Sequence, residues 1–478
     1  MEYVLDPNVP YYKYFEDMTR IPHGSYHEKA YSDYLVNWAR ERGLKCTQDE
    51  LYNVIICKPA SPGYEDRPAV ILQAHMDMVC VRTPDSNHDF EKEPLRLYVE
   101  DGWLRARDTT LGADDGVGCA YMLAILDSSD IAHPPLQCVF TTQEEVGCNG
   151  AAALKPEQFY AKRMIGLDDV GGGTSYVTTA GARISRIERE VVWLPAGGEP
   201  AYRMEVGGLL SGHSGADIEK ERGNAIKIAA AILFQLQKKG SVQLCQVNMG
   251  AADNAIPATG TVVFTSSMAP GQVAEIVTEY TEIFRRQLRE SDPGLEIHLT
   301  DCCAERKMSQ QDSKELITFL YVLPNGFRHK SMKLKDLTIA SSNLGTWEIQ
   351  GDKVVFTHNM RSAMDSYLDL MEDELEVLCG LFHLRRQVTA RVTGFSYIEH
   401  SPLRKALDQA FFEVTGRHIQ ELFVHGGIEA GSFSRLVPGM DIVTIGPLVL
   451  EEHTVNERLN LQSFDDIWKT LLKLLASL

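Results

Sequence analysis

Histidine and acidic side chains stand in this sequence where apolar stretches end. In ILQAHMDMVC, residues 71–80, His75 and Asp77 follow residues suited to the interior of a sheet. Side chains of a strand alternate between its two faces, so a spacing of two turns the imidazole and the carboxylate the same way. Both groups are ligands for zinc and neighbouring divalent metals, and the first hypothesis is therefore a metal site.

A pair of aspartates follows in TTLGADDGVG, residues 109–118. Asp114 and Asp115 lie in a glycine-flanked turn just before a predicted helix. Aspartate at the start of a helix can cap free amide groups and interact with the helix dipole. Capping therefore explains either residue as well as a metal site does, and both interpretations stay open at this point.

Further candidate ligands come directly after predicted strands. Glu144 and Glu145 follow one strand, Asp168 follows another, and His453 comes shortly after the last. Adjacent carboxylates repel each other, and near a buried strand end a cation or a proton would relieve that repulsion. The alternative for the two glutamates is an exposed loop.

The elements that must position these groups are strands alternating with helices over the first 180 residues. Helices are expected over 26–42 and 113–126, and strands over 53–57, 69–74, 137–142 and 164–167. This order predicts an α/β fold with a mostly parallel central sheet covered on both faces. Functional side chains in such sheets lie at strand ends, where the candidate ligands are found.

The pattern changes between residues 182 and 397. Two halves there share a β-α-β-β-α-β order, with helices expected over 218–239, 271–290, 313–323 and 366–384. Such halves are ferredoxin-like. The last residues return to the α/β pattern, with a helix over 402–415, a strand over 440–445 and a helix over 463–477. We therefore expect a catalytic domain of residues 1–181 and 398–478, interrupted by an α+β lid domain of residues 182–397.

Taken together, the candidate ligands outnumber what one tetrahedral zinc needs. His75, one aspartate of the 114–115 pair, one glutamate of the 144–145 pair, Asp168 and His453 would suit two metal ions about 3.5–4 Å apart, bridged by one carboxylate and a water. Asp77 would then lie behind His75, where a carboxylate fixes the tautomer of the ring and raises its basicity.

Composition limits the function classes. The chain has 478 residues, which favours two domains, and its formal net charge of −19 argues against nucleic acid as a partner. The sequence contains neither a signal-peptide pattern nor an apolar run of 18 residues, so we expect no membrane partner. The ten cysteines form no CxxC pair, and reduced thiols in the cytoplasm are the simpler expectation.

The ordered set of motifs resembles the co-catalytic zinc aminopeptidase and carboxypeptidase clan. The set runs H-x-D, G-A-D-D-G, E-E-x-G, L-D and then a late histidine. Within the clan, HMDMV, TTLGADDG, SGHSGADI, DNAIP, SSNLG and SPLRKAL are most similar to aminoacyl-histidine dipeptidases, which hydrolyse beta-alanyl-histidine and related dipeptides in the cytosol. The resemblance extends from IPHGS near residue 21 to the C-terminal helix.

The resemblance implies two divalent metal ions per chain, most often Zn²⁺, with Co²⁺ or Mn²⁺ as alternatives. The implied metal ligands are His75, Asp114, Glu145, Asp168 and His453. Asp114 would bridge the ions, Asp77 would orient His75, and Glu144 would be the general base that takes a proton from the attacking water and hands it to the leaving amine.

The resemblance also assigns residues to a small peptide substrate. His213 would stabilise the oxyanion, while Asn254 and Arg361 would contact the substrate's backbone or C-terminal carboxylate. Arginine suits a carboxylate because its fork donates two parallel hydrogen bonds. Gly427 and Glu429 match a loop that lines the active site, where Glu429 would meet the free amine. The alternatives are a capping or core histidine for residue 213 and a surface ion pair for residue 361.

Two other functions stay open. The same chemistry could act on another amide, such as an acylated amino acid or a tripeptide, because sequence does not size the lid's pocket. A non-catalytic metal or peptide binder is the alternative from another class, although the full set of ligands and Glu144 argue against it. We expect a homodimer.

Overall fold

A computed structural model describes residues 2–332 and 337–478, which form two compact units. Unit 1 comprises Met1–Thr178, Ser396–Phe423 and Ile428–Leu478, and unit 2 comprises Thr179–Phe395 and Val424–Gly427. The short segment 424–427, which the sequence analysis assigned to the catalytic domain, therefore groups with unit 2. Contacts explain this, because His425 hydrogen-bonds to Ser341 at 2.7 Å and Gly427 packs against Val392.

Unit 1 is built on a six-stranded sheet in the order β1-β2-β6-β3-β7-β21. The strands of this sheet are β1 Lys45–Gln48, β2 Val54–Lys58, β3 Val70–His75, β6 Leu136–Thr141, β7 Arg163–Gly166 and β21 Asp441–Thr444. Strands β6, β3, β7 and β21 run parallel, while β2 is antiparallel to both β1 and β6. The predicted parallel core of the sheet is thus confirmed, with an antiparallel extension on one side.

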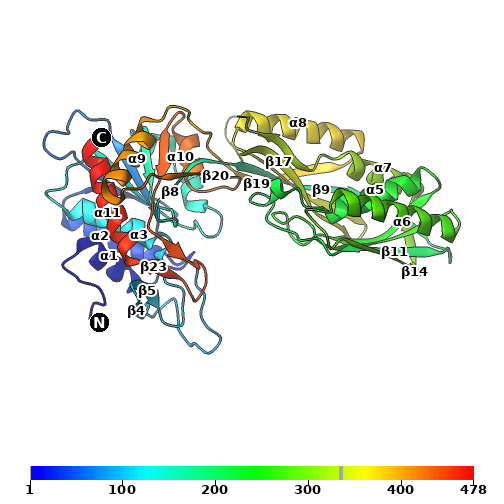
Figure 1. The fold of residues 1–478 in the computed structure, drawn as a ribbon, viewed down its shortest axis with the longest axis horizontal. Coiled ribbons are helices and arrows are strands. Elements are labelled where there is room, and N and C mark those ends of the chain that lie inside the picture. The colour runs from blue at the N-terminus through cyan, green and yellow to red at the C-terminus, as the bar shows by residue number, and fades with distance from the viewer. Residues whose placement is uncertain (1, 333–336) are drawn as a thin grey trace. The chain divides into compact units, whose positions relative to one another are not determined.

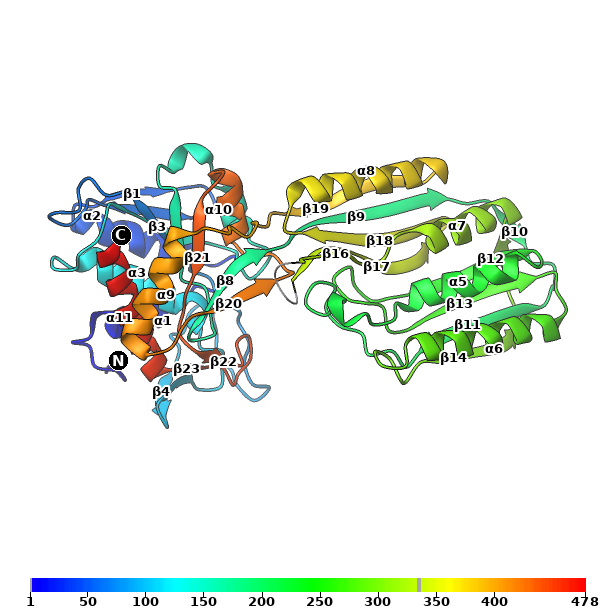
Figure 2. The same cartoon turned by 45° about the horizontal axis from the view of Figure 1, so that its top comes forward.

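Helices of unit 1 share one hydrophobic core with this sheet. They are α1 Pro10–Thr19, α2 Lys29–Glu41, α3 Ala113–Asp127, α4 Asn149–Ala153, α9 Pro402–Thr415, α10 Ala430–Leu436 and α11 Leu461–Ser477, with a short 3₁₀ turn at Pro156–Gln158. Side chains of α1, α2, α3, α9 and α11 form a single cluster with the strands, and Figures 1 and 2 show these helices together. Helix α3 is buried along nearly its whole length, which its small and apolar residues allow.

Two smaller sheets complete unit 1. Strands β4 Leu97–Glu100, β5 Trp103–Ala106, β22 Val449–Leu450 and β23 Arg458–Asn460 form an antiparallel sheet in the order β22-β23-β5-β4. Strands β8 Thr174–Thr179 and β20 Gln420–Val424 pair with each other. The first of these sheets joins the segment before α3 to the segment after His453.

Unit 2 contains a nine-stranded sheet with helices on one face and a separate two-stranded sheet. Its elements are β9 Gly181–Glu190, β10 Trp193–Pro195, β11 Ala201–Gly207, α5 Ala225–Gln237, β12 Val242–Met249, β13 Gly260–Ser266, α6 Pro270–Gln287, β14 Glu296–Cys302, β15 Arg306–Met308, α7 Gln310–Val322, β16 Gly326–Lys330, β17 Thr338–Gln350, β18 Lys353–Ser362, α8 Asp365–Leu381 and β19 Arg385–Val392, with a 3₁₀ turn at Ile218–Lys220. Strands β10 and β15 form the two-stranded sheet. Helices α5 to α8 contribute to one core (Figure 1).

The two β-α-β-β-α-β halves of unit 2 are nested rather than consecutive. The strand order is β14-β11-β13-β12-β17-β18-β9-β19, with β16 beside β17. Strands β11 to β14 with α5 and α6 make one half. Strand β9 belongs with β17, β18 and β19 and with α7 and α8, so the first half is inserted after the opening strand of the second. The β12–β17 pairing joins both halves into one sheet.

The helix predicted over 218–239 begins later than expected. Residues 218–220 form a separate turn, and Glu221 follows with a left-handed φ of 52°. Helix α5 then begins at Ala225, because the Asn224 side chain accepts hydrogen bonds from the N–H groups of Ile226 and Lys227 and so caps it.

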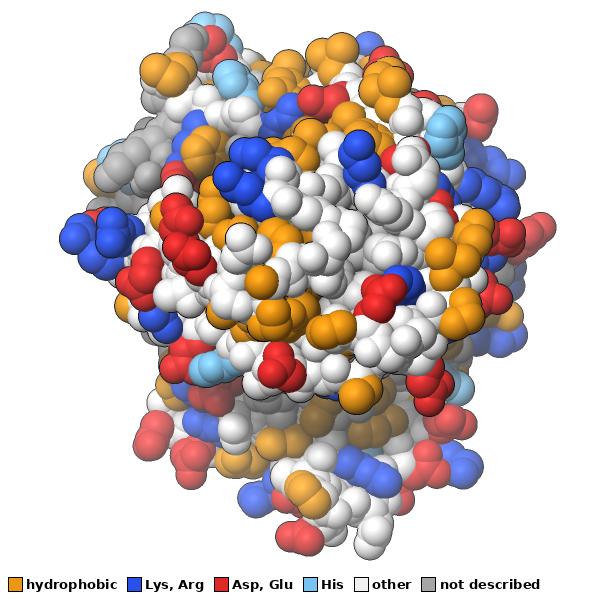
Figure 3. Space-filling model, turned by 90° about the vertical axis from the view of Figure 1, so that its right-hand side faces the viewer, with side chains coloured by type: hydrophobic (Ala, Val, Ile, Leu, Met, Phe, Trp, Pro, Cys, Tyr) orange, Lys and Arg blue, Asp and Glu red, His pale blue; other side chains and the backbone are white. Residues whose placement is uncertain are grey.

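The surface carries charges of both signs. Figure 3 shows one face on which acidic, basic and apolar side chains are intermixed. Over the described ranges 2–332 and 337–478, no helix is both long and apolar enough to cross a membrane.

Candidate metal and catalytic site

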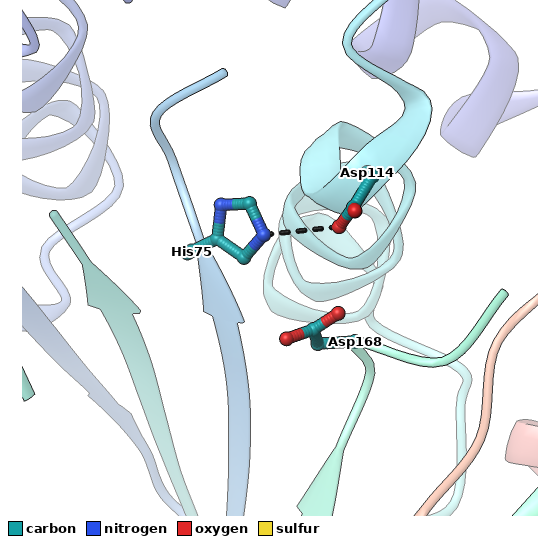
Figure 4. A group of neighbouring side chains, drawn as sticks. All are labelled: His75, Asp114 and Asp168. Atoms are coloured by element: carbon teal, nitrogen blue, oxygen red, sulfur yellow. Dashed lines mark hydrogen bonds and ion pairs between the residues drawn. The ribbon is translucent and has the colours of Figure 1, made fainter. Parts of the chain in front are cut away.

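The carboxyl ends of adjacent parallel strands bring the first candidate ligands together. Strand β3 lies between β6 and β7 and ends at His75, which is 1% exposed. Asp168 follows β7, and Asp114 comes from the start of α3 (Figure 4). The His75 Nε2 atom lies 3.0 Å from Asp114 Oδ1. The peptide bond between Asp114 and Asp115 is cis.

Asp114 belongs to two groups of potential metal ligands. One group contains His75, Asp114 and Asp168, and the other contains Asp114, Glu145 and His453, with donor atoms within 4.8 Å of one another in each. The two oxygens of Asp114 face different imidazoles, since Oδ1 faces His75 while Oδ2 lies 3.4 Å from His453 Nε2. His453 Nε2 is also 2.9 Å from Glu145 Oε1. The site therefore offers two ligand groups joined by one carboxylate.

The electrostatics of the site favour a bound cation. Burial raises the pKa of Asp168 well above its ordinary value, and the negative charge of Asp114 raises it further. Hydrogen bonds to Asp114 and Glu145 raise the pKa of His453 to about 10. Burial lowers the pKa of His75, but the interactions with Asp114, Asp77 and Asp168 together outweigh burial, and the net pKa is well above the usual range. The cluster thus attracts positive charge, which divalent ions supply.

Asp77 contacts more partners than the sequence analysis expected. Its Oδ1 accepts the Glu144 N–H at 3.0 Å, and its Oδ2 accepts the Ser25 hydroxyl at 2.8 Å and the Glu145 N–H at 3.3 Å. His75 Nδ1 lies 3.0 Å from the main-chain oxygen of Asp77 and 3.6 Å from its carboxylate. The hydrogen bond that fixes the His75 ring is thus made by the main chain, while the carboxylate holds the backbone of both glutamates.

The two adjacent glutamates have different surroundings. Glu145 faces His453, whereas Glu144 accepts a hydrogen bond at its Oε1 from the Cys148 thiol at 3.3 Å. Glu144 is also close to His75 and Glu145, with donor atoms within 4.8 Å. Burial raises its pKa above the ordinary value. Glu144 is therefore beside both ligand groups without belonging to the two that share Asp114.

Two acidic residues hold the turn that carries Asp114, and only one of them was a candidate in the sequence analysis. Asp115 is buried and accepts the Gly118 N–H at 3.0 Å, so its role is the capping one. Glu457, which the sequence analysis missed, is 4% exposed and accepts the N–H groups of Leu111, Gly112 and Ala113 at 2.8–3.2 Å. Nothing in the sequence around Glu457 signals this role, because its partners are main-chain groups.

Glu429 lies in the interior of unit 1. It is 1% exposed, and its Oε2 accepts hydrogen bonds from Gln73 Nε2 at 2.7 Å and Thr141 Oγ1 at 2.6 Å. Burial raises its pKa well above the ordinary value, and the nearby charge of Glu144 adds to this. Its Oε1 has no partner among the described residues. A contact with a substrate amine stays a prediction, and it would involve this free oxygen.

In unit 2, His213 is an exposed residue with a defined tautomer. Its Nδ1 accepts the N–H groups of Gly215 at 3.2 Å and Ala216 at 3.0 Å. A neutral ring with an accepting Nδ1 carries its proton on Nε2. The ring thus caps its own turn and still presents a donor N–H, so the capping alternative and an oxyanion role are compatible.

Arg361 lies near His213 within unit 2. It is 8% exposed, its Nε atom has no hydrogen-bond partner among the described residues, and the charge of Asp253 acts on it without forming an ion pair there. Burial lowers the pKa of both His213 and His425, and the charge of Arg361 lowers each further, that of His425 to about 3. Asn254 is exposed, and its main-chain oxygen accepts the Ser214 N–H at 2.7 Å. The surface ion pair considered for Arg361 is thus not found within the described part of the chain.

Gly427 is exposed in the segment that groups with unit 2. A Cβ atom there would lie 2.4 Å from Val392 Cγ1, so close packing accounts for the glycine. A substrate contact at Gly427 stays a prediction.

The fold agrees with comparisons to known proteins. The model of Peptidase family M20/M25/M40 matches residues 71–477, and the chain belongs to this family. It is 31% identical over 476 residues to the cytosol non-specific dipeptidase of Escherichia coli strain K12, covering 98% of this chain and 97% of that protein.

Solved structures give the same result. The crystal structure of aminoacylhistidine dipeptidase from Vibrio alginolyticus is similar over 100% of this chain and 98% of its own, with 29% identity and a TM-score of 0.93. Aminopeptidase PepT from Bacillus cereus shares the fold at 16% identity and a TM-score of 0.50. The resemblance inferred from the ordered motifs is confirmed.

Proposed function

We propose that this chain is a dipeptidase that uses two divalent metal ions, with Zn²⁺ as the expected metal and Co²⁺ or Mn²⁺ as alternatives. The observation that carries the proposal is the position of Asp114, whose two carboxylate oxygens face His75 and His453 separately. One carboxylate between two ligand groups is the arrangement that a two-metal site needs. The relatives from E. coli and V. alginolyticus, which match this chain over 98% and 100% of its length, are both named as dipeptidases.

Five residues would hold the metals. His75 and Asp168 would bind one ion, Glu145 and His453 would bind the other, and Asp114 would bind both. Bound divalent ions polarise a scissile carbonyl, and they lower the pKa of a bound water molecule to about 7, so that hydroxide is available at neutral pH. The donor set of two imidazoles and three carboxylates fits zinc and its neighbours in the first transition row.

Glu144 is the proposed general base. The Asp77 carboxylate holds its N–H, and the Cys148 thiol contacts its side chain, so the carboxylate is held beside the ligand groups. From there it would accept a proton from the attacking water and donate it to the leaving amine. General acid–base transfer by a positioned side chain contributes about 10²–10⁴-fold to a rate.

Unit 2 is proposed to supply substrate contacts. The Nε2–H of His213 would donate to the oxyanion, and Arg361 would bind the C-terminal carboxylate, a role that suits a buried guanidinium without an ion-pair partner among the described residues. The remaining proposed contacts are Asn254 and Gly427 of unit 2 and Glu429 of unit 1. The substrates would be dipeptides, of the Xaa-His and beta-alanyl-histidine type or a broader set.

The experiment that tests this function is release of free amino acids from dipeptides. Protein loaded with Zn²⁺, Co²⁺ or Mn²⁺ is incubated with a dipeptide panel that includes beta-alanyl-histidine, next to the same protein treated with a chelator. We expect release that the chelator abolishes and that added metal restores. Release only from acylated amino acids or tripeptides would contradict the dipeptidase proposal while keeping the chemistry.

Two further expectations accompany the proposal. We propose a cytoplasmic location, because the E. coli relative is named a cytosol dipeptidase. A homodimer stays a prediction from the resemblance, and light scattering of the metal-loaded protein would test it, with the mass of one chain as the contradicting result.

A further inference from the structure

A pocket of about 440 Å³ lies in unit 1 directly beside the candidate metal site. The residues that line it come from segments 24–27, 78–80, 90–91 and 145–146, and they include the proposed metal ligand Glu145. The metal and base roles described above do not use this space. A pocket of this volume has room for a large side chain.

The loop that forms one wall is fixed to the strand that carries the ligands. Gly24 forms a bridge with Met78, and a Cβ atom on Gly24 would lie 2.5 Å from Cys80 Sγ, so the Cys80 side chain packs directly against this glycine. The next residue, Ser25, donates to the Asp77 carboxylate at 2.8 Å. The pocket wall and the metal-site backbone are therefore connected through one hydrogen-bonded loop.

The walls of the pocket are mainly apolar. Tyr26, Met78, Val79, Phe90 and Val146 are among the lining residues, and Tyr26 is 66% exposed. Apart from Glu145, the ionisable groups that line the pocket are His27 and Glu91, whose Nε2 and Oε1 atoms lie 3.8 Å apart. Aromatic and aliphatic walls of this kind favour apolar side chains and do not provide a buried partner for a charged one.

We infer that this pocket receives the side chain of the N-terminal residue of the dipeptide, and that it favours large apolar or aromatic side chains. The inference rests on the proposed function. The scissile carbonyl belongs to the N-terminal residue, so the side chain on its Cα lies closer to the metals than any other side chain of the substrate. The pocket that reaches a metal ligand is therefore the one suited to this side chain.

The inference separates two substrate classes. Glycine and beta-alanine have no side chain to place in the pocket, whereas leucine and phenylalanine would bury apolar surface there. Even a single methylene group in an apolar pocket can change kcat/KM by about 10–200-fold. We expect kcat/KM for Phe-His and Leu-His to exceed that for Gly-His and beta-Ala-His by about 10–100-fold.

The first test is therefore a panel with a constant C-terminal residue: Gly-His, beta-Ala-His, Leu-His and Phe-His, measured on the zinc-loaded enzyme. Equal kcat/KM values across the panel would overturn the inference and leave the proposed function intact. No hydrolysis of any member would instead count against the proposed function itself. A second panel, Gly-Gly, Gly-Leu and Gly-Phe, varies only the C-terminal residue.

Variants of the pocket wall locate the effect. Phe90→Ala and Tyr26→Ala should each lower the ratio of kcat/KM for Phe-His over Gly-His by at least about 5-fold, in line with the loss of apolar contact area. The exposed Tyr26 gives a variant whose folding does not depend on the aromatic ring. Phe412→Ala, at another exposed aromatic residue of unit 1, is the matched control and should leave the ratio unchanged. If the wall variants change the Gly-Phe over Gly-Gly ratio instead, the pocket binds the C-terminal side chain and the inference is wrong.

Discussion

Asp77 illustrates how one side chain can organise a site without touching the reacting atoms. Its carboxylate accepts three hydrogen bonds, from Ser25 and from the N–H groups of Glu144 and Glu145. Both glutamates thus depend on the same carboxylate for the position of their backbone, although their side chains face different groups. The identity of Asp77 matters because only a carboxylate can accept on both oxygens.

Replacement of Asp77 by asparagine tests this role. The amide nitrogen of asparagine is itself a donor. It would face one of the groups that now donate a hydrogen bond to the Asp77 carboxylate, so the backbone of the glutamate pair should shift. We expect Asp77→Asn to lower metal affinity by about 10–100-fold, together with kcat. Competition with a fluorescent chelator measures the affinity directly.

Asp441 offers a matched control in unit 1. Its carboxylate likewise accepts a serine hydroxyl, from Ser401, and a main-chain N–H, from Leu403. Asp441→Asn should leave the metal affinity within about 2-fold of that of the unmodified protein. Loss of a group that supports a metal ligand would cost at least about 10-fold. Equal losses in both variants would show that Asp77 contributes only general stability.

At the scale of the elements, two segments that lie far apart in the sequence meet at the turn before Asp114. Strand β23 pairs with β5, and Glu457, just before β23, accepts three N–H groups of the segment that leads into Asp114. His453 belongs to the same C-terminal loop. The position of Asp114 relative to His453 therefore depends on Glu457 within unit 1.

Removal of the Glu457 carboxylate should loosen this connection. We expect Glu457→Ala to weaken metal binding by at least about 10-fold, the range measured for groups that support metal ligands. Because three buried N–H groups lose their acceptor at about 1–3 kcal/mol each, the melting temperature should fall as well. Glu457→Gln keeps an acceptor oxygen and should recover part of the affinity. Unchanged metal binding in the alanine variant would contradict this account.

The elements also show what sequence reasoning could reach. The strands that end at His75 and before Asp168 are mostly apolar, with Gln73 and Arg163 as exceptions, so the polar residues at their ends could be recognised in the sequence. Helix α5 was misplaced at its start, because the cap at Asn224 competes with an apolar pattern that begins earlier. Glu457 and Ser25 could not be assigned, since hydrogen bonds to main-chain or distant groups have no sequence period. The nested order of the β9 half depends on long-range strand pairing, which local patterns do not encode.

At the scale of the whole molecule, each unit has its own core and its own titrating groups. His358, on β18 of unit 2, is completely buried, and burial lowers its pKa to about 4. The His358 ring in the folded protein is therefore still neutral near pH 6.5, which is about the pKa of the same histidine in the unfolded chain. Stability from this group is fully present above pH 6.5 and is lost as the pH falls toward 4.

This sign leads to a measurable pH dependence that does not involve the metal site. A difference of about 2.5 pKa units corresponds to roughly 3 kcal/mol of stability lost in acid. We expect the melting temperature to fall between pH 7 and pH 5, and less so in His358→Asn. His298→Asn, at an exposed histidine of the same unit, should retain the full pH dependence. An identical slope in His358→Asn would rule out a contribution from this residue.

The central claim is that metal ions and Glu144 together hydrolyse a dipeptide, and one measurement tests it most directly. Zinc-loaded Glu144→Gln and unmodified protein are compared for metal content and for release of amino acids from the same dipeptide. The account predicts about two zinc ions per chain in both proteins and a loss of at least about 10²-fold in kcat for the variant. Undiminished release by Glu144→Gln with its metals in place would contradict the account.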